Sequence, residues 1–147
     1  MSLEEPVGLV ATKDVVTVSG WALVADAAAM MVQNNISCLP VSLGHGPVGI
    51  ITEKDIVKKV VAGGLDSTKV RVKEIMSFPL IAGAPTMSVR EAAEKMLKND
   101  IRRLVILDEE EKLIGLLTMT DILKLVAKAE GNPSVFIRYF SDSTGQR

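Results

Sequence analysis

The sequence predicts a mixed fold, α+β or α/β, built from two copies of one unit that pack through their sheets with pseudo-twofold symmetry. Three observations predict it. The segment GIITEKD (49–55) recurs as GLLTMTD (115–121), an offset of 115 − 49 = 66 residues. Upstream the halves align at a shift of 65, and the one extra residue falls where a turn is expected. The chain is 48% hydrophobic and only 3% aromatic, which suits an aliphatic core.

Each copy contains a helix with apolar residues on one face. In the first copy these residues run at helical spacing from Val24 to Val32, and in the second from Val89 to Leu97. The second helix also opens with Ser88 and, three residues later, an acid, which is the pattern of a capping box. An amphipathic helix is therefore predicted at the same place in both copies.

Two strands and a second helix complete each copy. Short apolar segments around a turn predict strands over 38–43 and 47–51, and again over 103–107 and 113–117. The final helices start at the threonines of the repeated segments and are predicted over 52–61 and 118–129, before glycine-containing stops. The resulting organisation is a first copy (7–64), a linker (65–72), a second copy (73–129) and a C-terminal tail (130–147). A copy of this size is marginally stable alone, so the two are expected to share one core.

Composition excludes several classes of function. The formal net charge is −1, which provides no general attraction to nucleic acid or to an anionic membrane surface. A single cysteine, Cys38, cannot form an internal disulfide and fits a reducing compartment such as the cytoplasm. The uncharged stretch 27–52 is interrupted by polar residues, glycine and proline, and is too broken to span a membrane. No nucleophile–base pair, paired acid and base or metal cluster is visible, so no catalytic residue, metal site or enzymatic activity is predicted.

The repeated Thr-x-x-Asp pattern has two interpretations. Thr52 and Thr118 can cap their helices, with Asp55 and Asp121 favouring the helix dipole. A capping box prefers Glu or Gln at the third position, as this chain uses at Glu91, and the shorter Asp is expected to reach back less well. Its oxygens would then stay free for a ligand, such as ribose hydroxyls. The duplication favours a ligand, and both roles can coexist.

Taken together, these features resemble a pair of cystathionine-β-synthase (CBS) domains, the Bateman module, over about residues 7–128. The resemblance rests on the tandem β-α-β-β-α copies, IMS (75–77), SVREAAEKM (88–96) and the Gly-x-x-Thr-x-x-Asp that closes each copy. It implies a non-catalytic sensor of an adenosine-containing metabolite: AMP, ADP, ATP, S-adenosylmethionine or NAD. No cofactor is required. It further implies control of an unknown partner protein or of the chain's own oligomer, commonly a homodimer arranged as a four-copy disc.

The same resemblance implies specific site residues. The motif side chains Thr52, Asp55, Thr118 and Asp121 would face ribose and phosphate in a cleft between the copies. The pair Arg102-Arg103, which could otherwise be a solvated basic pair, would meet Asp55 and bind phosphate, since guanidinium groups match phosphate oxygens. Asp121 would face the uncharged Ser37-Cys38 instead, and would suit an uncharged adenosine moiety or nothing. The expected adenine pocket comprises Val16, Val18, Ile36, Ser37, Cys38, Leu39, Leu80, Ile81, Ala82, Ile101 and Leu104.

Two further expectations concern the surface. Lys58 and Lys59 could reach a bound polyphosphate, but they are interpreted as exposed lysines of a helix. Three aromatic residues, Phe136, Tyr139 and Phe140, gather in the tail and predict a dimer contact or a partner surface, although they could also dock on the chain's own core. The alternative to a sensor is a ligand-free dimerisation or interaction module that uses such surfaces.

Overall fold

The computed structural model describes residues 2–130 and has the expected mixed α+β architecture with two three-stranded sheets. The chain forms two compact units. Within the described residues, unit 1 combines 2–13 with 82–109 and 114–130, and unit 2 combines 14–81 with 110–113. The three tail aromatics lie outside the described residues. Among the described residues, no helix is both long and apolar enough to cross a membrane.

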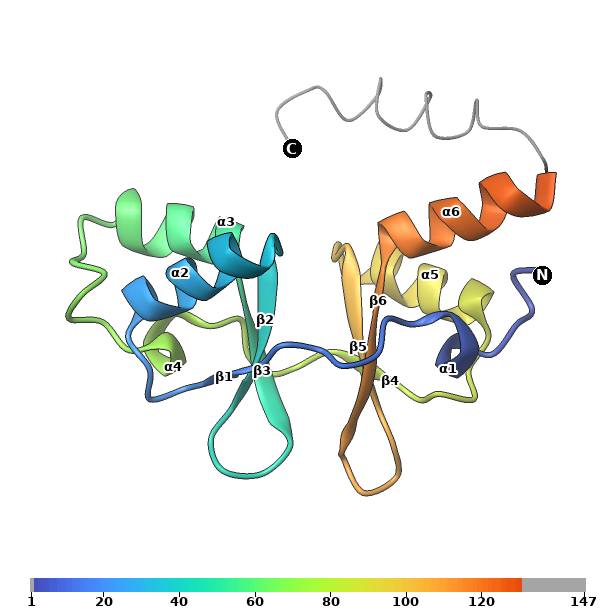
Figure 1. Ribbon diagram of the computed structural model, residues 1–147, viewed down its shortest axis with the longest axis horizontal. Helices are drawn as coiled ribbons and strands as arrows, with labels where there is room; N and C mark the ends of the chain where they lie inside the picture. Colours follow the sequence, from blue (N-terminus) through green and yellow to red (C-terminus); the bar gives the residue numbers. More distant parts are fainter. Residues whose placement is uncertain (1, 131–147) are drawn as a thin grey trace. The chain divides into compact units, whose positions relative to one another are not determined.

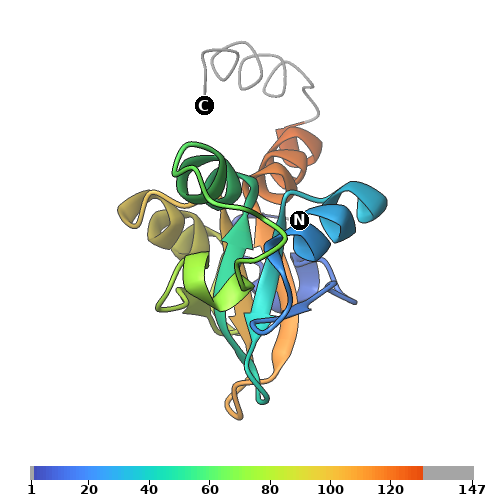
Figure 2. The same ribbon diagram turned by 90° about the vertical axis from the view of Figure 1, so that its left-hand side faces the viewer.

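Unit 2 contains the first sheet, in the order β1-β2-β3 (Figure 1). Strand β1 runs parallel to β2, and β2 runs antiparallel to β3, with Cys38 opposite Thr52. In Figures 1 and 2 the β2–β3 turn lies at the far end of the strands from the longer helices. The elements of this unit are β1 (Val18–Ser19), α2 (Val24–Asn34), β2 (Cys38–Ser42), β3 (Pro47–Thr52), α3 (Glu53–Asp55), the π-helix η1 (Ile56–Val61) and α4 (Val72–Ile75).

Unit 1 repeats this plan with its sheet in the order β4-β5-β6. Its elements are α1 (Val7–Val10), β4 (Ala82–Gly83), α5 (Val89–Lys98), β5 (Arg103–Leu107), β6 (Leu113–Thr118) and α6 (Met119–Glu130). The helices and strands predicted from the repeat are therefore confirmed to within two residues. The four-residue helices α1 and α4 were not predicted, because one helical turn is too short to show a period.

Each unit also includes the chain segment that precedes the other copy in sequence. In unit 2, the backbone of Ser77 donates to Ile50 O at 2.8 Å and accepts from Ile50 N at 3.1 Å. In unit 1, Thr12 and Leu116 exchange two such bonds of 2.9 Å. These two bridges are related by the repeat, since Thr12 matches Ser77 at the shift of 65 and Leu116 matches Ile50 at 66.

The glycine that opens each repeated segment permits this close approach. A Cβ at Gly49 would lie 2.8 Å from Ser77 O, and one at Gly115 would lie 2.8 Å from Thr12 O. Real Cβ atoms essentially never come within 3.0 Å of such an atom. The repeated segments therefore begin with glycine because another backbone strand crosses there.

The core of unit 2 is aliphatic, as the composition predicts. Fully buried side chains come from both strands and helices, among them Val24, Leu39, Ile51 and Val72. This packing fixes the end of β3, and with it the start of the following helix, where the first Thr-x-x-Asp motif lies.

Candidate functional site

The first motif forms a closed capping box. Thr52 is the last residue of β3, and its backbone is extended (φ −121°, ψ 164°). Its hydroxyl oxygen accepts from the Asp55 N–H at 3.1 Å, and Asp55 Oδ2 accepts from the Thr52 N–H at 3.0 Å. The capping interpretation is confirmed. The expectation that Asp reaches back less well than Glu is wrong, because the corresponding bond from the N–H of Ser88 to Glu91 is longer, at 3.4 Å.

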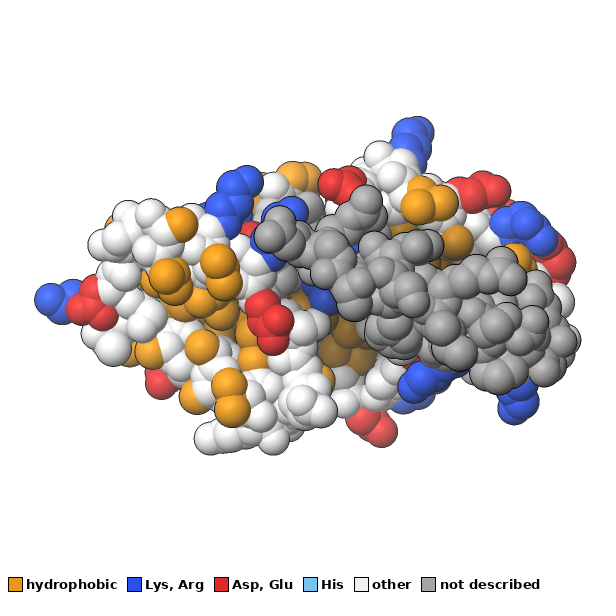
Figure 3. Space-filling model, turned by 90° about the horizontal axis from the view of Figure 1, so that it is seen from above, with side chains coloured by type: hydrophobic (Ala, Val, Ile, Leu, Met, Phe, Trp, Pro, Cys, Tyr) orange, Lys and Arg blue, Asp and Glu red, His pale blue; other side chains and the backbone are white. Residues whose placement is uncertain are grey.

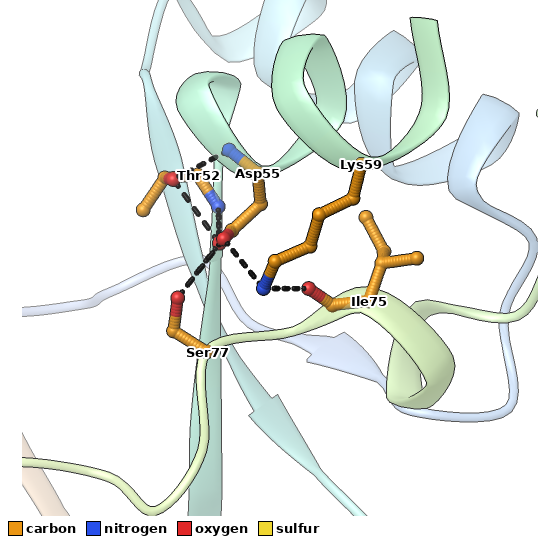
Figure 4. Close-up of polar contacts among 5 residues, drawn as sticks. All are labelled: Thr52, Asp55, Lys59, Ile75 and Ser77. Carbon is orange, nitrogen blue, oxygen red and sulfur yellow. Dashed lines mark hydrogen bonds and ion pairs between the residues drawn. The ribbon is translucent and has the colours of Figure 1, made fainter. Parts of the chain in front are cut away.

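Asp55 makes further contacts that the capping pattern does not require (Figure 4). The Thr52 hydroxyl donates to Oδ2 at 3.1 Å, and the Ser77 hydroxyl lies 3.0 Å from Oδ1 and 3.1 Å from Oδ2. Lys59 Nζ lies 3.1 Å from Oδ1 and donates to Ile75 O at 2.8 Å. Asp55 is only 6% exposed. The expectation that its oxygens are free is therefore wrong for this structure.

Lys59 is exposed, as expected, but it also makes an ion pair that was not expected. Its side chain is 40% exposed, yet its ammonium group pairs with the buried Asp55 carboxylate. The two residues are four apart, on one face of the helix formed by α3 and η1, which is a spacing at which opposite charges meet. Lys59 and Ser77 are thus the residues at this motif that the sequence interpretation missed. The spacing of Lys59 from Asp55 is the signal that could have found the first of them.

The second motif is capped in the same way, and fewer contacts to its aspartate are found among the described residues. The Thr118 N–H donates to Asp121 Oδ2 at 2.9 Å, and the Asp121 N–H donates to the Thr118 hydroxyl oxygen at 3.1 Å. The place of Lys59 is taken by Leu125, which is buried. Asp121 itself is only partly buried. Among the described residues, the donor found on the Asp121 carboxylate is the backbone N–H of Thr118.

The basic pair and its uncharged counterpart lie beside the motifs of their own units. The carbonyl of Arg102 accepts from the N–H of Met119 at 2.8 Å, next to Thr118. The carbonyl of Ser37 accepts from the N–H of Glu53 at 3.0 Å in the same manner, next to Thr52. Arg102 is exposed, and Arg103 begins β5 and is half-buried. Arg102 in unit 1 and Ser37 in unit 2 therefore each lie at the same end of the sheet as the Thr-x-x-Asp motif of their own unit.

The residues expected to hold adenine divide into two groups by burial. Leu39 and Leu104 are fully buried, and Val18 and Cys38 are nearly so, which makes them core residues. The others are half-buried: Val16, Ile36, Ser37, Leu80, Ile81, Ala82 and Ile101.

The comparisons with known proteins agree with this architecture. The family model of the CBS domain matches residues 7–62 and 72–128. An uncharacterised protein of Methanopyrus kandleri is 42% identical over 120 residues, which cover 81% of this chain and 61% of that protein. The chain thus spans about three fifths of the length of that relative.

Solved structures show the same fold. The CBS domain pair of protein MJ0100, in complex with 5′-methylthioadenosine and S-adenosylmethionine, is 28% identical, with a TM-score of 0.76 over 84% of this chain and 96% of that one. A hexameric CBS-CP12 protein from bloom-forming cyanobacteria is 37% identical, with a TM-score of 0.72 over 79% of this chain and 65% of that one. With both copies matched by the family model, this chain belongs to the CBS domain family as a tandem pair.

Proposed function

We propose that this chain is a non-catalytic regulatory module that binds an adenosine derivative and responds by changing its own assembly or that of a partner. The observation that carries the proposal is the duplicated motif. In each unit an aspartate stands at the end of a strand, three residues after a capping threonine. A carboxylate at such a place is a good acceptor for ribose hydroxyls. The likeness to a domain pair that was solved with 5′-methylthioadenosine and S-adenosylmethionine supports this ligand class.

The proposed ligand contacts follow the sequence interpretation. Asp55 and Asp121 would accept from ribose hydroxyls. Arg102 and Arg103 would bind phosphate when the ligand carries it, because guanidinium groups make paired hydrogen bonds to phosphate oxygens. AMP, ADP, ATP and NAD would then use the basic pair, whereas 5′-methylthioadenosine and S-adenosylmethionine would not.

A thermal-shift panel with these six compounds tests the proposal. A ligand present at a hundred times its Kd adds about 2.7 kcal/mol to the free energy of unfolding, which raises Tm measurably. The matched control is the double variant Asp55→Asn and Asp121→Asn, which keeps side-chain size and should lose the shift. If none of the six compounds changes Tm at millimolar concentration, the sensor proposal is wrong.

One variant tests the phosphate assignment separately. Arg102→Ala should weaken the binding of AMP and ATP. It should leave the affinity for 5′-methylthioadenosine, which has no phosphate, unchanged. If Arg102→Ala leaves AMP affinity intact and Asp55→Asn abolishes it, the basic pair does not bind phosphate.

A ligand-free dimerisation module is the second candidate, and the helix surface of unit 2 favours it. Val32 on α2 is 82% exposed, and Val57 and Val61 on η1 are 61% and 70% exposed. Hydrophobic side chains gather over these helices on the left of Figure 3. An exposed apolar group of this kind marks a protein contact. Sedimentation equilibrium of the wild type and of Val61→Lys tests it. At about 100 µM this measurement detects self-association with a free energy of roughly −5 kcal/mol or more favourable. A wild type that is monomeric at that concentration would exclude the dimerisation module.

A further inference from the structure

The Asp55 carboxylate is already occupied inside unit 2. It accepts hydrogen bonds from the backbone N–H and the hydroxyl of Thr52 and from the hydroxyl of Ser77, and it forms an ion pair with the ammonium group of Lys59, all at 3.0 to 3.1 Å (Figure 4). An ionised carboxylate offers about four acceptor sites. A ribose hydroxyl therefore meets a vacant acceptor at Asp55 only after one of these donors has left.

The donors differ in how easily they can leave. The two from Thr52 belong to the capping box, and their loss would open the first turn of the helix. Ser77 comes from a segment 22 residues farther along the chain. Lys59 is partly exposed and retains the carbonyl of Ile75 as a second acceptor. Ser77 and Lys59 are thus the donors that a ligand can replace.

Within residues 2–130, no counterpart of Ser77 or Lys59 is found on the aspartate of the second motif. Leu125 stands where Lys59 stands in the first copy. Thr12, which matches Ser77 and makes the same backbone bridge, has an exposed side chain. The two motifs therefore share a cap but differ in what competes for the carboxylate.

Building on the proposed function, we infer that Ser77 and Lys59 act as an internal competitor for the ligand at Asp55 and make the first motif the weaker binding site. They are positioning residues, since they act by occupying the carboxylate. A ligand hydroxyl that takes over Asp55 sets free the Ser77 hydroxyl. The backbone bridge between Ser77 and Ile50 does not involve this hydroxyl and stays in place.

Titration calorimetry with 5′-methylthioadenosine and AMP tests the inference. The Asp121→Asn background is used so that the measured site is the one at Asp55. Ser77→Ala should raise affinity about tenfold, which corresponds to about 1.4 kcal/mol, because the competing hydroxyl no longer lowers the binding-competent fraction. The matched control Thr12→Ala should leave affinity unchanged. Lys59→Leu, which copies the second motif, should also raise affinity and serves if Ser77→Ala fails to fold.

The outcomes separate this inference from the proposal beneath it. The Asp121→Asn protein is the parent in this comparison. If the parent binds a compound, and both Ser77→Ala and Lys59→Leu bind it no more tightly than the parent does, these residues do not compete with the ligand. Restoration of the parent affinity by Ser77→Thr, which returns the hydroxyl, would support the competitor role. If even the wild-type protein bound neither compound, the proposed function would fail and the competitor role would fall with it.

Discussion

Asp55→Asn offers a direct measure of how far the two motifs differ. Asparagine keeps the size of the side chain but removes the charge, and one of its two polar atoms becomes a donor. At Asp55 this donor would face the hydroxyl of Ser77 or the N–H of Thr52, which donate to the carboxylate in the wild type, or the ammonium group of Lys59, which forms an ion pair with it. Asp121→Asn makes the same chemical change where one backbone donor is found among the described residues.

The expected cost follows from the hydrogen bonds that the substitution weakens. A hydrogen bond to a charged group contributes about 1.5–3 kcal/mol and a neutral one about 0.5–1.5 kcal/mol, so each weakened bond costs about 1 kcal/mol. Three such bonds, two from Thr52 and one from Ser77, are weakened. The partly exposed pair with Lys59 adds about 0.2–1 kcal/mol. Asp55→Asn should therefore lower the free energy of unfolding by roughly 3–4 kcal/mol. Asp121→Asn weakens one such bond, from the Thr118 N–H, at a cost of about 1 kcal/mol. Both variants also lose a charge near a helix N-terminus, about 0.3–1 kcal/mol each.

Urea unfolding followed by tryptophan fluorescence measures the first of these costs. The single tryptophan, Trp21, lies in unit 2, where Lys73 Nζ stands 3.6 Å from the centre of its ring. It therefore reports the unit that contains Asp55, and circular dichroism follows the helices of both units. Equal losses of stability in the two variants, measured by both probes, would refute the assignment of extra bonding to Asp55.

Three further predictions follow from the backbone and from one surface carboxylate. Gly49→Ala should lower the free energy of unfolding by about 1–3 kcal/mol, because its Cβ would lie 2.8 Å from Ser77 O; an unchanged urea midpoint would contradict the crossing described at that glycine. Gly64→Ala should lower the free energy of unfolding by about 1–2 kcal/mol, because Gly64 follows η1 with φ +70°, a left-handed conformation that a residue with a Cβ adopts at about that cost. Gly63→Ala cannot serve as its control, because a Cβ at Gly63 would lie 2.3 Å from Lys59 O even though its φ is not positive. The hydroxyl and then the backbone N–H of Thr68 hold the pKa of Asp66 below its ordinary value of 3.8. The stabilising effect is thus present above the unfolded pKa and is lost as pH falls through the lower folded pKa, and Thr68→Val should move the pKa of Asp66 upward in a carboxyl NMR titration.

The helices and strands of the fold were predictable because the sequence pattern of each one occurs in both copies of the repeat. The periodic helices from Val24 and Val89, the strand pairs and the glycine that ends the first copy's helix are all local patterns, and the repeat confirmed each against its counterpart. What the sequence interpretation did not anticipate is which segment packs with which sheet. The bridge between Ser77 and Ile50 joins residues far apart in sequence, and neither carries a periodic or compositional signal of that pairing.

The candidate site was predictable in its residues and not in its bonding. Thr52 and Asp55 could be found by duplication alone, whereas the contact from Ser77 depends on how the chain returns to β3. The pairing with Lys59 was within reach of a helical spacing rule. It was missed because an exposed lysine on a helix is usually solvated, and only the burial of its partner makes the pair significant.

The choice of Asp over Glu in both motifs has a different explanation from the one that the capping pattern suggested. Asp55 and Asp121 accept from their cap N–H groups at 3.0 and 2.9 Å, whereas Glu91 does so at 3.4 Å. The short aspartate side chain therefore completes the cap, and the cap does not leave its carboxylate free. Since the cap uses Oδ2 in both copies, the proposed ligand would depend on the remaining oxygen. In the first copy that oxygen meets Lys59 and Ser77. The duplicated motif thus keeps its structural role in both units, while under the proposed function the residues around it would set how readily each one binds a ligand.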